Sequence, residues 1–293
     1  MKAAPFEYAR PGSVAETIDL LRADDGAKVI AGGQSLVPLM AMRLARPTLL
    51  VDVNDLHLDA VEMELPLATD AGFLRIGATT RHRRLENDPV IRRAAPLLAE
   101  AAGLIGHPAI RVRGTIGGSL AHADPLAELA AVLVACRGAV VAQGPAGKRT
   151  IAAADLFAGF LTTTLAPDEL LVEVTLPAAA PGHGSAFCEW APRAGDFAVA
   201  GIGVAVERTP DLTCTSARAV AIGFGSVPND CSDALSSVVG ASSADDTLLR
   251  DVARRVGLEL AGDDDRSELV GLLAARAVLR AFGRSTRSGE VAA

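Results

Sequence analysis

Two glycine pairs constrain the fold of this chain more than any other feature of its sequence. Gly32-Gly33 runs into Gln34-Ser35, and Gly117-Gly118 stands between the hydroxyl residues Thr115 and Ser119. Because glycine has no side chain, a ligand can approach the backbone there and meet several N–H donors at once. A single glycine pair is most often a tight turn. Two such pairs indicate two loops that hold an anionic ligand, most simply a phosphate.

The segments around both pairs read as strand, loop and helix. Lys28–Ala31 is a short buried strand that precedes the first loop, and Leu36–Leu44 is an apolar helix that follows it. After the second loop, Asp124 and Pro125 fit the N-cap and the first residue of a helix. Neither loop matches G-x-G-x-x-G or carries a P-loop lysine, which argues against the familiar mononucleotide folds. A ligand with two phosphates, clamped between separate subdomains, would use both loops.

The first 177 residues are expected to form one domain in two subdomains, about 1–55 and 56–177. Ser13 and Glu16 form a capping box that opens a helix over Val14–Ala23, and a strand over Leu49–Val53 completes a small α/β unit. In the second subdomain the pattern predicts strands at Val61–Met63, Phe73–Gly77, Ala139–Ala142 and Leu170–Leu176, a turn at Gly144–Gly147, and helices at Arg81–Glu86 and Val90–Ala101.

The Pro-, Gly- and Ala-rich segment Pro177–Gly184 is the best candidate for a domain boundary. Strands followed by helices indicate a smaller α+β domain over 185–283, with a flexible tail over 284–293. We expect strands at Ala186–Trp190, Ile202–Glu207 and Arg218–Gly223, and helices at Asp245–Leu260 and Ser267–Phe282.

Composition excludes several classes of protein. A net charge of −7 and an aromatic fraction of 3% argue against a nucleic-acid binder. Met1–Pro11 lacks the apolar core of a secretory signal and no apolar run is long enough for a membrane span, so we expect a cytoplasmic protein. The four cysteines have no C-x-x-C spacing, which indicates buried free thiols rather than a zinc or iron–sulfur site. They are Cys136, Cys188, Cys214 and Cys231.

The chain offers little catalytic chemistry of its own, and we assign no catalytic residue and no metal ligand. The histidines lack metal-ligand spacing, and neither Ser35 nor Ser119 has the G-x-S-x-G setting of a hydrolase. His122 beside the second loop is either a flavin contact or, more ordinarily, an imidazole bonded to the backbone. The run Arg81–Arg84 is most simply a solvated face, and we keep it as a candidate subunit contact.

The two loops resemble those of a known family. Ala31–Ser35 and Thr115–Pro125 are similar to the two FAD-pyrophosphate loops of the medium, flavin-binding subunit of molybdenum hydroxylases, the relatives of carbon monoxide dehydrogenase and xanthine dehydrogenase. The resemblance extends from Pro5 to the last helices. It implies an α+β fold of the vanillyl-alcohol-oxidase (PCMH) type in two subdomains, followed by a smaller C-terminal α+β domain, with FAD held non-covalently.

Carried over position by position, the resemblance implies a set of cofactor-binding residues. Asp124 or Glu128 would accept hydrogen bonds from ribose or ribityl hydroxyls, and Phe197, where bacterial relatives often have tyrosine, would cover the isoalloxazine. Xanthine-oxidising relatives often have lysine where Cys188 stands and asparagine where Ser119 stands, so this chain is nearer to the carbon monoxide dehydrogenase branch. The full set is Val29, Ile30, Ala31, Gly32, Gly33, Gln34, Ser35, Leu36, Ile105, Gly106, Ile110, Thr115, Ile116, Gly117, Gly118, Ser119, His122, Asp124, Glu128, Leu171 and Phe197.

The function implied by the resemblance is electron transfer in a heteromeric molybdenum hydroxylase. Electrons would come from a large molybdopterin-binding subunit through a small subunit with [2Fe-2S] clusters, reduce FAD in this chain, and leave to an acceptor that the sequence leaves open. The assembly would be a dimer of heterotrimers. The surfaces around Arg81–Arg84 and Arg111–Arg113 are candidates for docking, and the sequence leaves open which face is used. Two alternatives remain: a self-sufficient FAD-dependent oxidoreductase of the same fold, and a nucleotide-binding assembly subunit without redox function.

Overall fold

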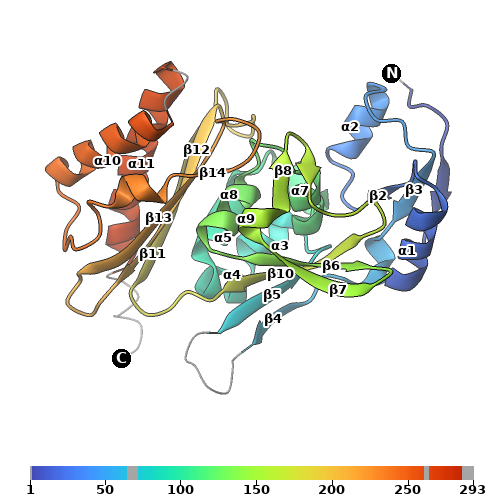
Figure 1. The fold of residues 1–293 in the computed structure, drawn as a ribbon, viewed down its shortest axis with the longest axis horizontal. Coiled ribbons are helices and arrows are strands. Elements are labelled where there is room, and N and C mark those ends of the chain that lie inside the picture. The colour runs from blue at the N-terminus through green and yellow to red at the C-terminus, as the bar shows by residue number, and fades with distance from the viewer. Residues whose placement is uncertain (1, 65–71, 261–263, 286–293) are drawn as a thin grey trace.

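Three sheets follow one another along the longest axis of the molecule (Figure 1). The computed structural model describes residues 2–64, 72–260 and 264–285. Within these residues the first sheet has three strands, the second five and the third four, and a separate ribbon pairs β8 (Phe157–Gly159) with β9 (Thr162–Thr163). Helices cover the second and third sheets, so the fold is a mixed α+β fold.

The N-terminal sheet is parallel, with the strand order β1-β3-β2. Its first helix begins as the capping box predicts, because the Ser13 hydroxyl accepts from the Glu16 N–H at 3.1 Å and the Glu16 carboxylate accepts from the Gly12 N–H at 2.8 Å. The second helix was expected to reach Leu44 but ends at Ala41, because Arg43 adopts a left-handed φ of 61°. The elements are β1 (Glu7–Ala9), α1 (Val14–Ala23), β2 (Lys28–Ile30), α2 (Leu36–Ala41), β3 (Leu49–Asp52) and η1 (Asn54–Leu56).

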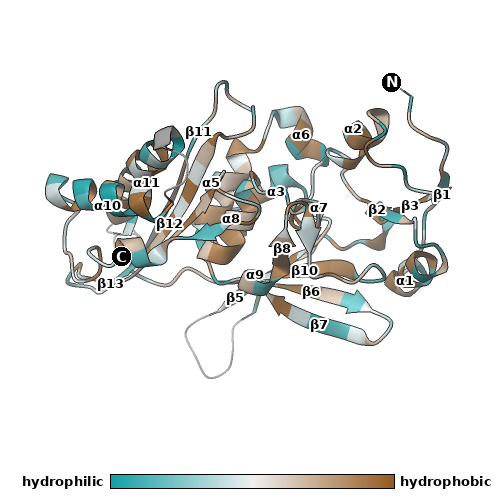
Figure 2. Ribbon diagram, turned by 45° about the horizontal axis from the view of Figure 1, so that its top comes forward, coloured by the Kyte–Doolittle hydropathy of each residue, from teal (hydrophilic) through white to brown (hydrophobic). Residues whose placement is uncertain are grey.

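The second sheet is antiparallel and has the order β4-β5-β10-β6-β7. Its apolar face packs against α5 and α8, and α8 and β10 are hydrophobic over most of their length (Figure 2). The turn expected at Gly144–Gly147 joins β6 to β7, a strand that the sequence did not predict. The strands are β4 (Val61–Glu64), β5 (Phe73–Gly77), β6 (Ala139–Gly144), β7 (Gly147–Ala152) and β10 (Leu170–Pro177).

The helices of this region differ most from the sequence-based prediction. The helix expected over Val90–Ala101 is two helices, because Pro96 has no N–H to continue the first and Ala95 leaves the helical region with φ −141° and ψ 65°. Of two short helices that carry site residues, α7 was predicted as a loop and α6 was not predicted. The helices are α3 (His82–Asn87), α4 (Pro89–Ala94), α5 (Pro96–Leu104), α6 (Pro108–Arg113), α7 (Ile116–His122), α8 (Glu128–Ala135) and α9 (Ala153–Leu156).

The C-terminal sheet, in the order β11-β12-β13-β14, lies between two helical layers. One face packs on α10 and α11, and Phe187, Val220 and Ile222 on the other face join the core formed by α5 and α8. One core thus spans the predicted boundary, and the division into domains stays a prediction. The elements are β11 (His183–Trp190), β12 (Ala200–Arg208), β13 (Cys214–Ile222), β14 (Asn229–Asp230), η2 (Ser232–Leu235), α10 (Asp246–Glu259) and α11 (Asp264–Ser285).

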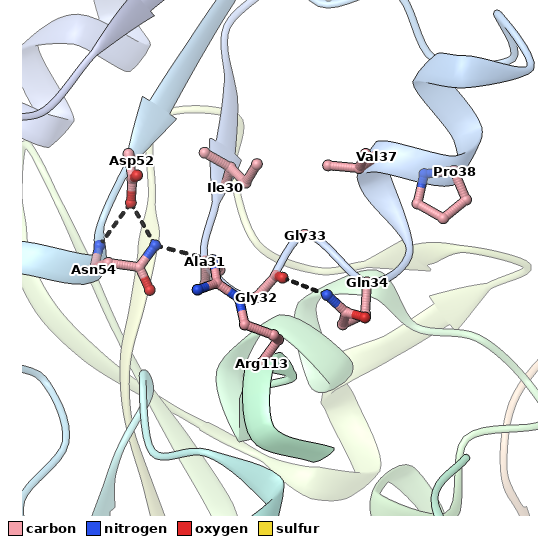
Figure 3. A pocket seen from close by; sticks show the side chains of 10 residues that line it. All are labelled: Ile30, Ala31, Gly32, Gly33, Gln34, Val37, Pro38, Asp52, Asn54 and Arg113. Carbon is pink, nitrogen blue, oxygen red and sulfur yellow. Dashed lines mark hydrogen bonds between the residues drawn. The ribbon is translucent and has the colours of Figure 1, made fainter. Parts of the chain in front are cut away.

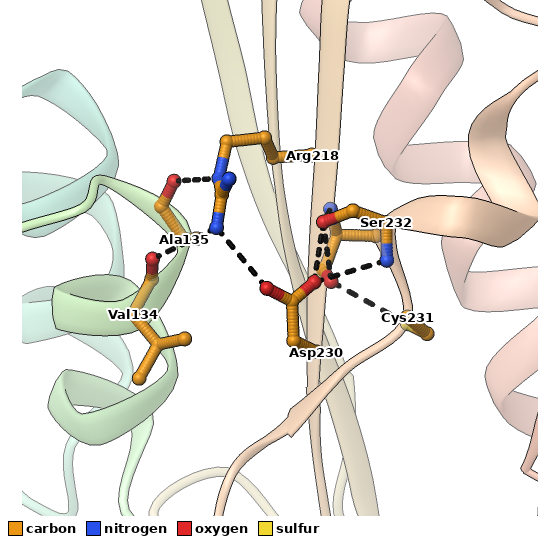
Figure 4. Close-up of polar contacts among 7 residues, drawn as sticks. Val134, Ala135, Arg218, Asp230, Cys231 and Ser232 are labelled. Atoms are coloured by element: carbon orange, nitrogen blue, oxygen red, sulfur yellow. Dashed lines mark hydrogen bonds and ion pairs between the residues drawn. The ribbon is translucent and has the colours of Figure 1, made fainter. Parts of the chain in front are cut away.

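Polar contacts also join the third sheet to its neighbours. Arg218 on β13 donates to the carbonyl of Ala135 at 3.0 Å and to that of Val134 at 3.4 Å, where α8 ends, and pairs with Asp230 on β14 at 3.1 Å (Figure 4). Its cation therefore donates to two carbonyls at a helix C-terminus, where a positive charge also complements the helix dipole. Arg284 of α11 similarly contacts Glu100 of α5 at 2.6 Å.

Some of the remaining sequence-based expectations agree with the structure, and others do not. The last helix extends to Ser285, so the flexible tail does not begin at residue 284, and residues 286–293 lie outside the described part of the chain. Cys188, Cys214 and Cys231 are buried free thiols, as expected, whereas the free thiol Cys136 is only partly covered. No helix among the described residues is long and apolar enough to cross a membrane.

Candidate functional site

The first glycine loop borders an open pocket of about 340 Å³ at the end of β2 (Figure 3). Gly33 takes a left-handed φ of 69°, which turns the chain sharply between the strand and α2. The amide N–H groups of Gly33, Gln34 and Ser35 donate to no protein acceptor in the described part of the chain. The pocket is lined by Ile30, Ala31, Gly32, Gly33, Gln34, Val37, Pro38, Asp52, Asn54 and Arg113.

The end of α6 closes one side of this pocket. The residue that does so is Arg113, two residues before Thr115, where the second glycine segment begins. A Cβ atom on Gly32 would lie 2.4 Å from the Arg113 carbonyl oxygen and 2.8 Å from the Gly114 Cα. Only glycine allows this approach of two backbones. The structure therefore brings together the two glycine segments, which the sequence predicted to bind one ligand.

A chain of side-chain hydrogen bonds holds the two segments together. The Asn54 amide donates to the Ala31 carbonyl at 2.9 Å and accepts from the Arg81 guanidinium at 2.6 Å, and Arg81 also donates to the Arg113 carbonyl. Asp52 orients Asn54 by accepting from its N–H at 2.9 Å. Burial disfavours the ionised form of Asp52, but hydrogen bonds from Tyr8 and Asn54 outweigh it, so the pKa of Asp52 is lowered.

The second glycine pair lies inside a helix rather than in an open loop. Thr115 is the N-cap of α7, and its hydroxyl accepts from the Gly118 N–H at 3.1 Å. The Gly117 N–H donates to the Ala78 carbonyl at 2.8 Å, and a Cβ on Gly117 would lie 2.6 Å from the Ala78 Cβ. The expectation that the backbone of this segment offers several free donors is therefore wrong, because its N–H groups already have partners within the protein.

The helix expected to start at Pro125 begins three residues later. Ala123 ends α7 with a left-handed φ of 52°, and the Asp124 carboxylate accepts from the Leu126 N–H at 2.9 Å, which makes a turn. The N-cap of α8 is Ala127, and Glu128 is its first residue. Asp124 therefore organises the connection between two helices and is not the N-cap.

Carboxyl groups gather at the start of α8. Burial raises the pKa of Glu128 to about 8, with smaller contributions from the charges of Glu189 and Asp124. Burial also raises the pKa of Glu189, at the end of β11, to about 7, and its Oε2 atom is covered without a hydrogen-bond partner in the described part of the protein. Glu128 is half-buried, so a ligand hydroxyl could reach its carboxyl. Sequence reasoning missed Glu189, because strand β11 carries no motif that marks it.

Ile105, Gly106 and Ile110, which the resemblance places among the cofactor-binding residues, lie around one turn. Gly106 has a φ of 48°, and Arg111 donates to the carbonyls of Ile105 at 3.1 Å and Gly106 at 2.8 Å. The segment that contains Phe197 packs against this turn, since a Cβ on Gly195 would lie 2.4 Å from the His107 ring. The Phe197 side chain is 70% exposed, so it is not part of the hydrophobic core.

Other expected contacts lie outside the pocket at the first loop. Leu171 is 5% exposed and belongs to the core. Ser35 is exposed, and Val29 and Leu36 are half-buried. His122 lies in the last turn of α7, and its ring makes no hydrogen bond within the described residues, so the backbone-bonded imidazole is not found there.

Sequence reasoning missed Asp52, Asn54 and Arg113 as residues that line this pocket. A signal existed for Asp52 and Asn54, because Asp52 is the last residue of β3 and Asn54 follows it, and β3 is the neighbour of the strand that ends at the first loop. Arg113 was assigned to a docking surface. The pocket can bind an anionic ligand through backbone N–H donors and the Arg113 guanidinium. No group of three or more potential metal ligands occurs in the described ranges.

Comparison with known proteins identifies the family. The model of the FAD binding domain in molybdopterin dehydrogenase matches residues 4–179, more than half of the chain. The chain belongs to this family. The 6-hydroxypseudooxynicotine dehydrogenase complex subunit alpha of Paenarthrobacter nicotinovorans is 42% identical over 80% of this chain and 78% of its own length. The carbon monoxide dehydrogenase medium chain of Hydrogenophaga pseudoflava is 39% identical over 70% of each chain.

A solved structure extends the family relationship to nearly the whole chain. Carbon monoxide dehydrogenase from Hydrogenophaga pseudoflava, in a form that lacks the Mo-pyranopterin moiety of its molybdenum cofactor, superposes with a TM-score of 0.89 at 33% identity. The match covers 97% of this chain and 99% of that one. The C-terminal sheet and its two helices are therefore a feature that this member of the FAD-binding family shares with the medium chain of carbon monoxide dehydrogenase.

Proposed function

We propose that this chain is the FAD-binding electron-transfer subunit of a heteromeric molybdenum hydroxylase. Family membership supports the cofactor and the class of enzyme. The observation in the molecule that carries the proposal is the pocket at the first loop, which is lined by Arg113 and by Gly33 and Gln34, whose N–H groups have no protein acceptor in the described residues. We assign the fold to the vanillyl-alcohol-oxidase (PCMH) type, with the domain division described above.

The residues present fit FAD. The diphosphate needs N–H donors and positive charge, which the pocket offers, and close approach of the backbone, which Gly32 and Gly33 permit. The ribityl hydroxyls need acceptors, which Asp124 and Glu128 provide. The isoalloxazine needs an apolar wall and a ring, which Ile105, Ile110 and the exposed Phe197 provide.

When bound, FAD supplies redox chemistry that accepts electrons from one partner and delivers them to another. The chain itself binds and orients. The contact of Gly32 with Arg113 and Gly114 fixes the distance between the two glycine segments. Arg111 stabilises the turn at Gly106 by donating hydrogen bonds to the carbonyls of Ile105 and Gly106. Glu128 and Glu189 have pKa values raised toward neutrality, and we assign neither of them to an organic substrate, in keeping with a subunit that transfers electrons.

The partners that we propose are a large molybdopterin-binding subunit and a small [2Fe-2S] subunit, assembled as a dimer of heterotrimers. Relatives are named as a medium chain or as a subunit of a complex, which supports an assembly of several chains. The names of those relatives cover substrates as different as carbon monoxide and 6-hydroxypseudooxynicotine. This variety is expected if substrate binds on another chain. The cytoplasmic location stays a prediction.

The proposal is tested first on the isolated chain. It should bind one FAD per chain, and acid should release the flavin into solution, because no covalent attachment holds it. Flavin that stays with the precipitated protein would contradict this part of the proposal. A chain that binds adenine nucleotides but no flavin would support the assembly subunit instead.

The second test uses the native complex. Purification from the host at low salt should bring down a larger molybdopterin protein and a smaller cysteine-rich protein. Under anaerobic conditions substrate should bleach the flavin absorbance of the complex and leave that of the isolated, flavin-loaded chain unchanged. If the isolated chain turned over substrate at the rate of the complex, the self-sufficient flavoenzyme would replace the subunit.

A further inference from the structure

The helix α2 is apolar throughout, yet Met40 is its only buried side chain. A helix that is apolar on every face normally lies in the interior of a protein. In Figures 1 and 2, α2 instead lies at the outer edge of the molecule. Val37 and Pro38 line the pocket at the first loop, so a bound ligand covers that side of the helix. The residues at its C-terminal end stay uncovered, because Met42 is 51% and Leu44 74% exposed.

The turn that ends α2 departs from the usual helix stop. The Leu44 N–H donates to the Leu39 carbonyl at 2.9 Å and the Arg43 N–H to the Met40 carbonyl at 3.0 Å, which are the hydrogen bonds of a Schellman motif. Glycine usually takes the left-handed position of this motif, but here Arg43 takes it, with a φ of 61°. The next residue normally packs against its helix, but Leu44 is largely exposed. The chain thus holds an arginine in a strained conformation and leaves an apolar side chain in solvent.

An exposed aromatic residue of the N-terminal segment lies beside this turn. The Arg43 Nε donates to the Lys2 carbonyl at 3.3 Å, and the Glu7 N–H donates to the Thr48 carbonyl at 2.7 Å. Phe6, which is 41% exposed, lies in the chain between these two contacts. The exposed residues of this region form what we call the α2 surface: Phe6, Met42, Arg43, Leu44 and Arg46.

The α2 surface is basic on an acidic chain. Residues 26–51 contain no Asp or Glu, although the net charge of the whole chain is −7. The Arg43 and Arg46 side chains donate to the carbonyl oxygens of Lys2 and Arg43, at 3.3 and 3.1 Å, and neither pairs with a carboxylate in the described residues. Exposed apolar side chains beside such cations are typical of an interface whose partner supplies apolar contacts and carboxylates.

The two arginine runs considered from the sequence are less suited to docking. Arg81 donates to the Arg113 carbonyl and to the Asn54 side chain. Arg111 pairs with Glu86 at 3.0 Å and donates to two carbonyls of the preceding turn. Each run thus gives one of its guanidinium groups to the fold, whereas the cations of the α2 surface have no carboxylate partner in the described residues.

A second copy of this chain does not fit the α2 surface. In a two-fold contact the same residues of both copies face each other, so the arginines at positions 43 and 46 of the two copies would meet. Like charges brought together in this way oppose association. The charge pattern therefore favours a different chain as the occupant.

We propose that the α2 surface docks another chain of the heteromeric complex, one whose contacting surface is apolar at its centre and carries carboxylates around it. Leu44 enters the apolar part, and Arg43 and Arg46 pair with the carboxylates. The strained turn at Arg43 presents Leu44 to the partner. This inference rests on the proposed function, because it gives the proposed complex one of its contact surfaces.

The first test removes the apolar contact. The native complex is separated into its chains, and the Kd for rebinding of this chain to the remaining chains is measured by titration. Leu44→Gln should raise that Kd about tenfold or more, because the complex loses the burial of a leucine side chain. The matched control is Leu258→Gln, which changes a leucine of α10 that is 63% exposed and should leave the Kd unchanged. Iron and molybdenum per FAD in the purified complex should fall in Leu44→Gln alone.

The second test, Arg43→Gly, separates docking from folding. Glycine adopts the left-handed φ without strain, so the variant should unfold at about the temperature of the wild type. It should nevertheless raise the Kd for the remaining chains about three- to tenfold, and the Kd should depend less on salt, because one cation of the interface is lost. The matched control is Leu212→Gly, which relieves a left-handed φ of 67° at another exposed residue and should leave the Kd unchanged.

The outcomes separate this inference from the proposed function. If the wild type binds no FAD, or binds FAD and purifies with no other chain, the proposed function fails. If the complex forms and both Leu44→Gln and Arg43→Gly bind the remaining chains as tightly as the wild type, only the assignment of the α2 surface fails. Self-association of the isolated chain, or its binding to phosphatidylglycerol vesicles, that Leu44→Gln abolishes while the other chains still bind would also overturn this assignment, because another occupant would then cover the surface.

Discussion

Replacing Gly32 by alanine tests whether the two segments form one site. The added Cβ would lie 2.4 Å from the Arg113 carbonyl oxygen and 2.8 Å from the Gly114 Cα, both of them backbone atoms that no rotamer change can move away. Carbon–oxygen contacts require about 3.3 Å, so the first loop and the end of α6 must separate by about 1 Å. Overpacking of this kind costs about 1–3 kcal/mol of stability.

Gly147→Ala is the matched control for this change. Gly147, in the turn between β6 and β7, has a φ of 107°, so alanine there is strained by about 1–2 kcal/mol, but its Cβ would have no atom within 4 Å and the residue does not line the pocket. Both variants should therefore lose similar stability in thermal unfolding. Only Gly32→Ala should separate the two segments and displace Arg113 from the pocket.

The assay is titration of each apoprotein with FAD, followed by flavin fluorescence, beside circular dichroism and thermal unfolding. We expect Gly32→Ala to bind FAD about tenfold more weakly or worse, which corresponds to about 1.4 kcal/mol for each factor of ten, and Gly147→Ala to remain within about threefold of the wild type. Equal losses in the two variants, or full affinity in Gly32→Ala, would refute the idea that close approach of these backbones forms the site.

Two further predictions concern the other end of the site. Because the pKa of Glu128 is about 8 in the folded chain and 4.5 in the unfolded one, the unfolded state releases this proton first, and the stability of the apoprotein should fall as pH rises from 4.5 to 8. Glu128→Gln should remove that contribution, so its stability relative to wild type should rise by about 2–4 kcal/mol between pH 5 and pH 8 in urea unfolding; a constant difference would contradict the buried carboxyl. Phe197→Ala should change apoprotein stability by less than about 0.5 kcal/mol, because the ring is 70% exposed, yet it should shift the flavin spectrum and weaken FAD binding about two- to tenfold. An unchanged spectrum and Kd would remove Phe197 from the flavin site.

Much of the fold could be predicted from local pattern. The capping box at Ser13 and Glu16 marks the start of α1, and Asp245, expected as the first residue of α10, is its N-cap. The apolar segments located most of β10, β12 and β13, although β12 extends beyond the predicted range at both ends and β13 begins earlier than predicted, at Cys214. These predictions succeeded because they depend on hydrogen bonds and burial patterns within a few residues of each other.

The errors arose where a long-range contact or an alternative local turn overrode the expected preference. Gly117-Gly118 reads as a loop, but the Ala78 carbonyl and the Thr115 hydroxyl hold these residues in the first turn of α7. Asp124-Pro125 reads as a helix start, but the left-handed Ala123 and the turn at Asp124 delay α8 to Glu128. In the first case a partner far away in the sequence takes part, and in the second the same residues form a turn in place of the helix start.

The amino-acid sequence by itself determined the family, the cofactor class and the two segments on which the site depends. Those conclusions rest on residue types at fixed spacing, which the sequence shows directly. Only the tertiary structure decided which segment keeps free N–H donors, that Arg113 closes the pocket at the first loop, and that Asn54 and Arg81 join the two. Such facts depend on which backbone groups find partners after folding, and that is settled by packing between residues far apart in the sequence.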